Sequence, residues 1–130
     1  MILLDTHIAL WAVTDDPLLP ALAKTYMLAP DAEVFVSTAS IWEISIKHAL
    51  GPNTPGRLLV SGTQAIADFE SSGFGLLPIL PSHAALAGAL PRHHADPFDR
   101  MLVAQAMLEG LVLITHDRAL AAYHPGVIVV

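Results

Sequence analysis

The sequence predicts an α/β fold in which helices cover both faces of a central parallel sheet of about four to five strands. Short apolar runs such as 111–114 have the length and composition of strands that are buried on both faces. These runs alternate with helical segments, and that alternation implies right-handed β-α-β crossovers within one parallel sheet. With 130 residues, 54% of them hydrophobic, the chain is expected to form a single α/β/α domain over residues 1–130.

The first half of the chain is expected to supply two strands and three helices. The apolar run 2–4 is a minimal strand, and Asp5 or Thr6 directly after it can cap a helix that continues to Val13. The Asp-Asp-Pro run at 15–17 ends this helix. The other elements expected in this half are a helix at about 20–29, a strand at 33–37 and a helix at about 38–50, closed by Gly51 and Pro52.

The second half is organised around the stretch 96–117. Asp96 is a good N-cap residue, Pro97 suits the first helical position, and Asp99 falls where a carboxylate can reach back to the cap. The following helix is apolar almost all round until Gly110 ends it, so it should be buried. The other expected elements are a helix at 65–72, an edge strand at 76–80 interrupted by Pro78, a helix at 81–90, a strand at 111–114, a short helix at 120–123 and a strand at 127–130.

Composition and charge limit the classes of function. The net charge of −6 argues against nucleic-acid binding by bulk electrostatics, although an acidic protein can hold a phosphate when metal ions neutralise its carboxylates. Cysteine is absent, which excludes a thiolate metal site and suits a reducing cytosol. No apolar run reaches the roughly 18–20 residues that span a bilayer, and the first residues lack the basic region of a signal peptide. We therefore expect a cytoplasmic protein.

Four acids stand at comparable positions in the predicted fold. Asp5 and Asp117 each follow a predicted strand, while Glu43 and Asp99 lie in the first turns of helices. Each has a local explanation. The three aspartates can cap helices, and Glu43 can pair with Lys47 four residues later, which stabilises a helix by roughly 0.2–0.5 kcal/mol.

The four acids considered together favour a metal site. If the first and fourth strands are neighbours where the strand order reverses, Asp5 and Asp117 converge on one crevice. Helices entering beside that crevice bring Glu43 and Asp99 toward it. Four carboxylates in one pocket repel each other and raise one or more pKa values unless a cation is present. Oxygen ligands without cysteine suit Mg²⁺ or Mn²⁺, ions that can activate a water and stabilise the leaving oxygen of a phosphodiester.

Four stretches of the chain also match the motifs of a known family, in the family's order and across nearly the whole sequence. They are 4–7 (Leu-Asp-Thr-His), 40–44 (Ser-Ile-Trp-Glu-Ile), 94–102 (His-Ala-Asp-Pro-Phe-Asp-Arg-Met-Leu) and 114–117 (Ile-Thr-His-Asp). In these stretches the chain resembles the PIN-domain ribonucleases, and within them most closely the VapC-type toxins of toxin–antitoxin pairs. The Asp-Pro-Phe-Asp-Arg block is the most specific element, and the loop 51–62 matches least well.

The resemblance implies a PIN-like domain that hydrolyses RNA with Mg²⁺ or Mn²⁺, as the toxin of a type II pair whose antitoxin is a separate chain. The family's acidic metal-site positions fall on Asp5, Glu43, Asp99 and Asp117. Thr6 and Thr115 become hydroxyl neighbours that orient carboxylates or water, and Asp96 is expected mainly to cap its helix. Arg100 or Arg118 is expected to contact the RNA backbone.

Histidines offer a different reading of the same region. His93 and His94 beside Asp96 suggest zinc, but adjacent histidines point apart on regular backbone, and a zinc site usually takes three or four nitrogen or sulfur ligands. His7 and His116 lie beside candidate acids and are candidates for substrate contact. For most of the seven histidines a surface or hydrogen-bonded structural role is expected.

A homodimer is expected, partly from the resemblance and partly from composition. The mean hydropathy of +0.57 suggests more apolar surface than one core of this size can hide. Trp11, Leu18 and Leu19 are the candidate interface residues. Trp11 and Trp42 are expected to pack in the core or an interface rather than to stack on bases.

Two non-enzymatic alternatives deserve comparison with the ribonuclease hypothesis. A receiver-like signalling domain is also a small parallel α/β fold, but it needs an acidic pair after the first strand and a lysine after the last. This chain has one acid there, and its only lysines are Lys24 and Lys47. A PIN fold that only binds a partner would be favoured by loss of an acid, and all four are present.

Overall fold

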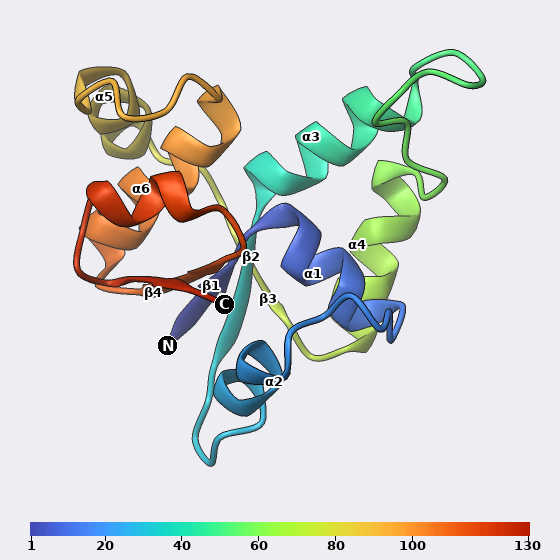
Figure 1. The fold of residues 1–130 in the computed structure, drawn as a ribbon, viewed down its shortest axis with the longest axis horizontal. Coiled ribbons are helices and arrows are strands. Elements are labelled where there is room, and N and C mark those ends of the chain that lie inside the picture. The colour runs from blue at the N-terminus through green and yellow to red at the C-terminus, as the bar shows by residue number, and fades with distance from the viewer.

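The computed structural model describes residues 1–130 and contains one sheet of five strands (Figure 1). The strands are β1 (Ile2–Leu4), β2 (Val34–Ser37), β3 (Gly75–Leu77), β4 (Val112–Thr115) and β5 (Val127–Val129), in the spatial order β3-β2-β1-β4-β5. Every neighbouring pair is parallel, as predicted. β3 lies at an edge and ends before Pro78, which has no N–H to donate to a neighbouring strand.

Six α-helices and one 3-10 helix connect the strands, and each occupies a segment predicted to be helical. They are α1 (Thr6–Val13), α2 (Ala21–Met27), α3 (Thr38–His48), α4 (Gly62–Ser71), α5 (Pro81–Ala89), α6 (Pro97–Glu109) and η1 (Arg118–Ala122). The helix α4 begins three residues earlier than predicted because the Ser61 hydroxyl caps it, accepting a hydrogen bond from the Gln64 N–H at 3.1 Å. The length and hydropathy needed to cross a membrane are not combined in any helix.

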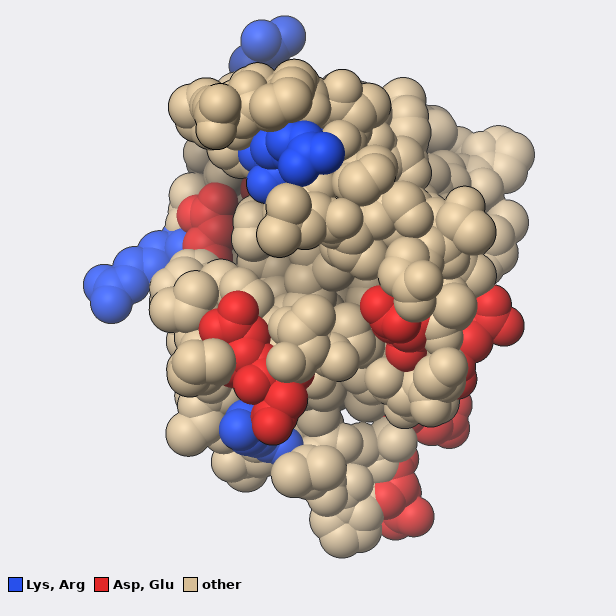
Figure 2. Space-filling view, turned by 90° about the vertical axis from the view of Figure 1, so that its right-hand side faces the viewer, with Lys and Arg blue, Asp and Glu red and all other residues tan.

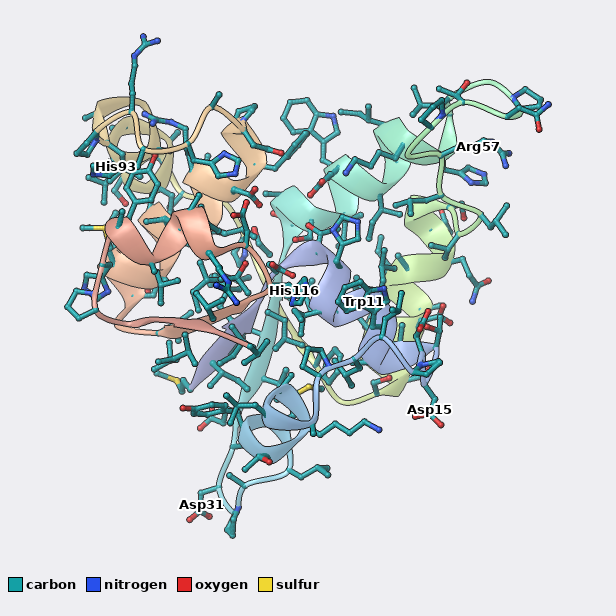
Figure 3. All side chains as sticks on the ribbon, in the orientation of Figure 1. Trp11, Asp15, Asp31, Arg57, His93 and His116 are labelled. Atoms are coloured by element: carbon teal, nitrogen blue, oxygen red, sulfur yellow. The ribbon has the colours of Figure 1, made fainter.

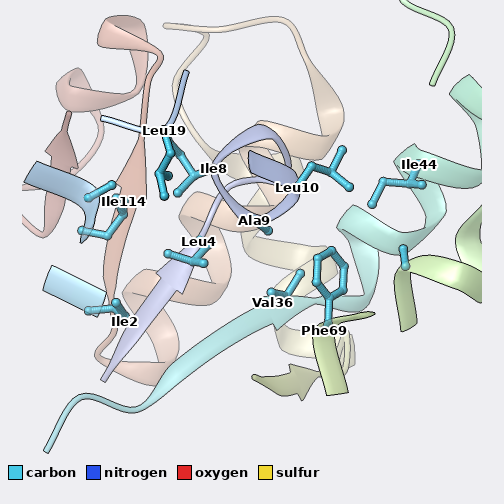
Figure 4. Packing of buried hydrophobic residues seen from close by; sticks show 12 residues of the cluster. Ile2, Leu4, Ile8, Ala9, Leu10, Leu19, Val36, Ile44, Phe69 and Ile114 are labelled. Carbon is cyan, nitrogen blue, oxygen red and sulfur yellow. The ribbon is translucent and has the colours of Figure 1, made fainter. Parts of the chain in front are cut away.

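Alternate side chains of the sheet feed two hydrophobic cores, one on each face. Ile2 and Leu4 pack with residues of α1 to α4, as Figure 4 shows. Leu3 and Leu113 pack on the opposite face with α5, α6 and η1. Burying a leucine or isoleucine completely contributes about 1.5–3 kcal/mol, so these two layers hold the helices against the sheet. The predicted α/β/α sandwich is therefore confirmed.

Two hydrophobic expectations need correction. Leu19, expected at a dimer interface, is only 8% exposed and belongs to the core beside α1. Trp42 was expected in a core or an interface, and the core half of that expectation is wrong: the residue is 62% exposed and meets Phe98 edge to face at a centroid distance of 5.3 Å, so an interface stays a prediction. Helical spacing could not separate these cases, because both residues lie on segments with apolar neighbours.

The first and fourth strands are neighbours at the point where the strand order reverses. β1 pairs with β2 on one side and β4 on the other, and Leu4 stands level with both Val36 and Ile114. From β1 the chain continues through β2 and β3 on one side of the sheet, then returns by α5 and α6 (Figure 1). The next strand, β4, pairs with the other side of β1. The carboxyl ends of β1 and β4 therefore open onto one crevice, which in parallel sheets is where ligands bind.

Candidate active site

The four predicted acids line a single cleft at these carboxyl ends. Its volume is about 440 Å³, and its walls come from the ends of β1 and β4 and from the helices α1, α3 and α6. The residues around it are Asp5, Thr6, His7, Trp11, Glu43, Lys47, Asp96, Asp99, His116, Asp117 and Arg118. The fold thus brings together four acids that lie up to 112 positions apart in the sequence.

Asp5 directly follows β1 and is 7% exposed. Its Oδ1 accepts the Ile8 N–H at 2.9 Å and so caps α1. Its Oδ2 accepts the Thr115 hydroxyl at 2.5 Å and the His116 N–H at 3.3 Å. One oxygen of Asp5 therefore caps α1, while the other is held at the end of β4 and the carboxylate still lines the cleft.

Glu43 combines the predicted helical ion pair with burial. Its Oε2 lies 2.7 Å from Lys47 Nζ, and its Oε1 accepts the Thr6 hydroxyl at 2.6 Å. The residue is only 4% exposed, so this is no ordinary surface pair. Thr6 orients the carboxylate of Glu43, as Thr115 orients that of Asp5.

Asp99 stands apart because it performs no local task. The predicted reach of its carboxylate back to the helix cap is wrong, since the Asp96 N–H is taken by His94 Nδ1 at 2.9 Å. Asp96 does cap α6, accepting the N–H groups of Phe98 and Asp99. Burial, followed by the negative charges of Asp96, Asp5 and Glu43, raises the pKa of Asp99 from 3.8 to about 7.

Asp117 shows the opposite electrostatic behaviour. Its Oδ1 accepts the Ala119 N–H at 2.9 Å and caps η1, and its Oδ2 accepts a 2.6 Å hydrogen bond from His94 Nε2. Burial acts to raise the pKa of Asp117, but the bonds from Ala119 and His94 outweigh it and hold the pKa below the ordinary value. The cleft therefore pairs an acid that ionises readily with one, Asp99, that resists ionisation.

His94 is the site residue that the sequence reading missed. Its Nε2 lies 2.6 Å from Asp117 Oδ2 and 3.5 Å from Asp99 Oδ2. Potential ligand atoms of these three residues all lie within 4.8 Å of one another. The neighbouring His93 packs against Tyr123 at a ring-centroid distance of 5.0 Å. The sequence signal for His94 is its position two residues before Asp96, the aspartate that caps α6.

Aromatic rings close one side of the cleft. Trp11 lies between His7 and His116, with centroid distances of 5.9 and 5.8 Å, and Figure 3 shows Trp11 and His116 side by side. Trp11 therefore faces the acidic cleft. The expected proximity of His7 and His116 to the acids is also present, since both line this cleft.

The basic residues divide into two groups. Lys47 and Arg118 line the cleft. Arg100 instead donates to the main-chain carbonyls of Ala87 and Leu90 at 2.8 and 2.9 Å, tying the end of α5 to α6. The prediction was that Arg100 or Arg118 contacts the RNA, and these bonds, which turn the Arg100 guanidinium inward, favour Arg118 for that role. On the face shown in Figure 2, the basic side chains are separated from one another by acidic and uncharged residues.

The chemistry of the donor set fits a hard divalent cation. Four carboxylates line the same cleft, and burial, followed by the negative charges of Asp96, Asp5 and Glu43, raises the pKa of Asp99. A cation among them would offset these negative charges, and carboxylate oxygens suit Mg²⁺ or Mn²⁺ better than a soft metal.

Comparison with known proteins adds a second line of evidence. The model of a family described as the PIN domain matches residues 2–124. The chain belongs to the PIN-domain family. This PIN domain is 30% identical over 126 residues to Ribonuclease VapC22 of Mycobacterium tuberculosis, an alignment that covers 95% of this chain and 93% of the relative. The resemblance predicted from the four motifs is confirmed.

Solved structures share the architecture of this PIN domain. A toxin–antitoxin complex from Klebsiella pneumoniae has a chain that is 22% identical, with a TM-score of 0.67 and coverage of 98% of this chain and 96% of that one. VapBC2 from Rickettsia felis, bound to a DNA fragment from its promoter, is 15% identical with the same TM-score, covering 100% and 98%. FitAcB from Neisseria gonorrhoeae is 20% identical, with a TM-score of 0.60 and coverage of 92% and 90%. At these identities the likeness supports the fold.

Proposed function

We propose that this PIN domain is a divalent-metal-dependent endoribonuclease that acts in the cytoplasm as the toxin of a toxin–antitoxin pair. The observation that carries the proposal is the convergence of four carboxylates in one cleft, with Asp99 held there without a hydrogen bond to satisfy it and with a raised pKa. A group placed at such cost indicates a functional rather than a structural role.

The residues divide the work by position. Asp5, Asp99 and Asp117, with Glu43 beside them, are the groups that would hold Mg²⁺ or Mn²⁺. Such an ion supplies charge neutralisation for a phosphodiester and lowers the pKa of an attacking water. Thr115 and Thr6 keep two of the carboxylates oriented through the hydrogen bonds already described.

Two cations of the chain are placed to meet the RNA. Arg118 is exposed at the edge of the cleft, and Lys47 lines it while paired with Glu43. Because the protein carries a net charge of −6, these local contacts and the bound cation must supply the attraction for phosphate.

The proposed protein partner is a separate antitoxin chain. Its basis is the description of the structural neighbours as toxin–antitoxin assemblies and the name of the curated relative. A neighbouring reading frame that encodes a small protein with a DNA-binding head and an extended tail would support this assignment. A neighbouring frame of unrelated kind would count against it.

The non-enzymatic alternatives are not favoured. A receiver-like domain needs a free lysine after the last strand, whereas Lys47 lies on α3 and is bound to Glu43. A PIN fold without catalysis has no need for an aspartate with a raised pKa inside its cleft.

The test is cleavage of RNA by purified protein in EDTA and after addition of Mg²⁺ or Mn²⁺. We expect no cleavage in EDTA and recovery with either ion, while Asp5→Asn purified in parallel controls for contaminating nuclease. Undiminished cleavage in EDTA would reject the proposed metal dependence, and absence of cleavage with both ions and a range of RNAs would reject the nuclease.

A further inference from the structure

His94 joins two of the acids through one imidazole ring. We infer that His94 is a positioning residue, which fixes the carboxylate of Asp117 beside Asp99 through an Nε2–H donor, and that it is not a metal ligand. The inference rests on the metal site proposed above.

The hydrogen bond at Nδ1 determines where the ring proton lies. The Asp96 backbone N–H points to His94 Nδ1 at 2.9 Å. A backbone N–H can only donate, so Nδ1 acts as an acceptor and carries no proton. The ring proton is therefore on Nε2.

Nε2 faces the carboxylates with that proton. It lies 2.6 Å from Asp117 Oδ2 and 3.5 Å from Asp99 Oδ2. A ring nitrogen that bears hydrogen has no lone pair to offer a cation. Histidines that ligate metals usually show the reverse arrangement, in which the second ring nitrogen donates to a carboxylate or a carbonyl. His94 accepts there instead, so its Nε2 serves the carboxylates.

The backbone of His94 is anchored as firmly as its ring. Its N–H donates to the Tyr123 hydroxyl at 2.8 Å, and its carbonyl accepts from Tyr123 and from Arg100 Nη1 at 3.3 and 3.5 Å. The ring thus spans from the cap of α6, the helix that carries Asp99, to the cap of η1, which is Asp117. It therefore ties the carboxylate of Asp117 to the start of the helix that carries Asp99.

The first test reads the ring directly. Nitrogen-15 NMR of the imidazole in the whole protein reports which nitrogen carries the proton, before and after addition of Mg²⁺ alone. We expect Nε2 to keep its proton and Nδ1 to remain an acceptor in both conditions. Loss of the Nε2 proton when Mg²⁺ binds would overturn the inference, because it would make His94 a ligand.

The second test uses two variants that each retain one half of the ring's function. In His94→Gln the amide nitrogen reaches the position of Nε2 and can donate to Asp117. In His94→Asn the side-chain oxygen can still accept the Asp96 N–H but cannot reach Asp117. Calorimetric titration with Mn²⁺ should show a loss of affinity of roughly tenfold for the Asn variant, while the Gln variant retains most of the affinity.

Two results would contradict the positioning role. Equal loss in both variants would indicate that the ring itself binds the ion, and full affinity in both would indicate that His94 has no role in the site. Should either variant fail to fold, the NMR measurement on the unaltered protein still decides. Neither experiment contains RNA. The role of His94 can therefore be judged even if the protein proves to have no ribonuclease activity.

Discussion

At the scale of single residues, the cleft separates acids with a local task from an acid without one. Asp5 caps α1, Asp117 caps η1 and Glu43 pairs with Lys47, so each of these contributes to the fold as well as to the cleft. Asp99 caps nothing and has a pKa of about 7. The fold gains nothing from its charge, which makes Asp99 the strongest evidence for a functional site.

The raised pKa of Asp99 predicts an unusual dependence of stability on pH in EDTA. The pKa of about 7 keeps a proton on Asp99 in the folded state up to about pH 7, whereas the unfolded chain loses it near the ordinary pKa of 3.8. The free energy of unfolding contributed by this group therefore falls as the pH rises through that window and stays low above it. Asp99→Asn should remove the effect.

Melting temperatures in EDTA at pH 5 and pH 8 measure this difference. We expect the Asn variant to gain on the unaltered protein at pH 8 by roughly 1–2 kcal/mol, reduced because Asp99 is partly exposed to solvent. Equal differences at the two pH values would show that Asp99 is not held against repulsion.

What the sequence could not supply at this scale was the destination of hydrogen bonds. Helix-start statistics place Asp96 at the cap correctly, and the structure confirms it. They also suggest that Asp99 bonds back to that cap, because a carboxylate three residues later is usually the nearest acceptor. His94 Nδ1 accepts the Asp96 N–H instead. This bond depends on the path of the backbone before the helix, which helix-start statistics do not describe.

At the scale of elements, Arg100 acts as a clamp between two helices. Its guanidinium binds the carbonyls of Ala87, Leu90 and Pro91, which the end of α5 leaves without helical partners. Arg100→Gln should therefore lower the stability by about 1.5–3 kcal/mol, the usual contribution of a hydrogen bond to a charged group.

Arg118→Gln is the matched control for this prediction. Arg118 is exposed and lines the cleft, so its loss should leave the melting temperature unchanged and weaken RNA binding. Thermal melts and RNA-binding titrations of both variants check the pair. If Arg100→Gln keeps its stability but binds RNA more weakly, the result would favour Arg100 as a contact to the RNA phosphate backbone.

Many element boundaries follow from local chemistry. Gly110 ends α6 at φ 67, as the sequence predicts, whereas β3 ends at the residue before Pro78 and not at residue 80 as predicted. The early start of α4 was not predicted, because the residue that follows the cap Ser61 is Gly62, and glycine is a weak helix former.

At the scale of the whole molecule, the order of the strands creates the site. Alternation of strands and helices predicts a parallel sheet, and the position of the crevice then follows only if β1 and β4 are neighbours. The structure confirms that pairing, with Leu4 beside Ile114. The side on which each hydrophobic residue falls was harder to predict, since Leu19 turned inward and Trp42 outward.

The remaining exposed apolar surface supports the prediction of a homodimer. Leu18, Leu22 and Leu28, in and around α2, are 65%, 48% and 81% exposed. Light scattering at micromolar concentration should give twice the chain mass of 13.8 kDa. Leu18→Lys combined with Leu28→Lys should give monomers, while Leu59→Lys, at an equally exposed leucine in the 51–61 loop, should not. A monomer mass for the unaltered protein would contradict the prediction.

The most direct measurement of the metal-dependent site compares Asp99→Asn with Asp96→Asn. Asn caps a helix about as well as Asp, so Asp96→Asn should keep the fold, Mg²⁺ binding and most RNA cleavage. Asp99→Asn removes a charged oxygen ligand and should lose cleavage and bind Mg²⁺ more weakly while remaining folded. Measured cleavage rates and Mg²⁺ titrations of the two proteins decide. Normal cleavage by Asp99→Asn together with loss of cleavage in Asp96→Asn would contradict the account.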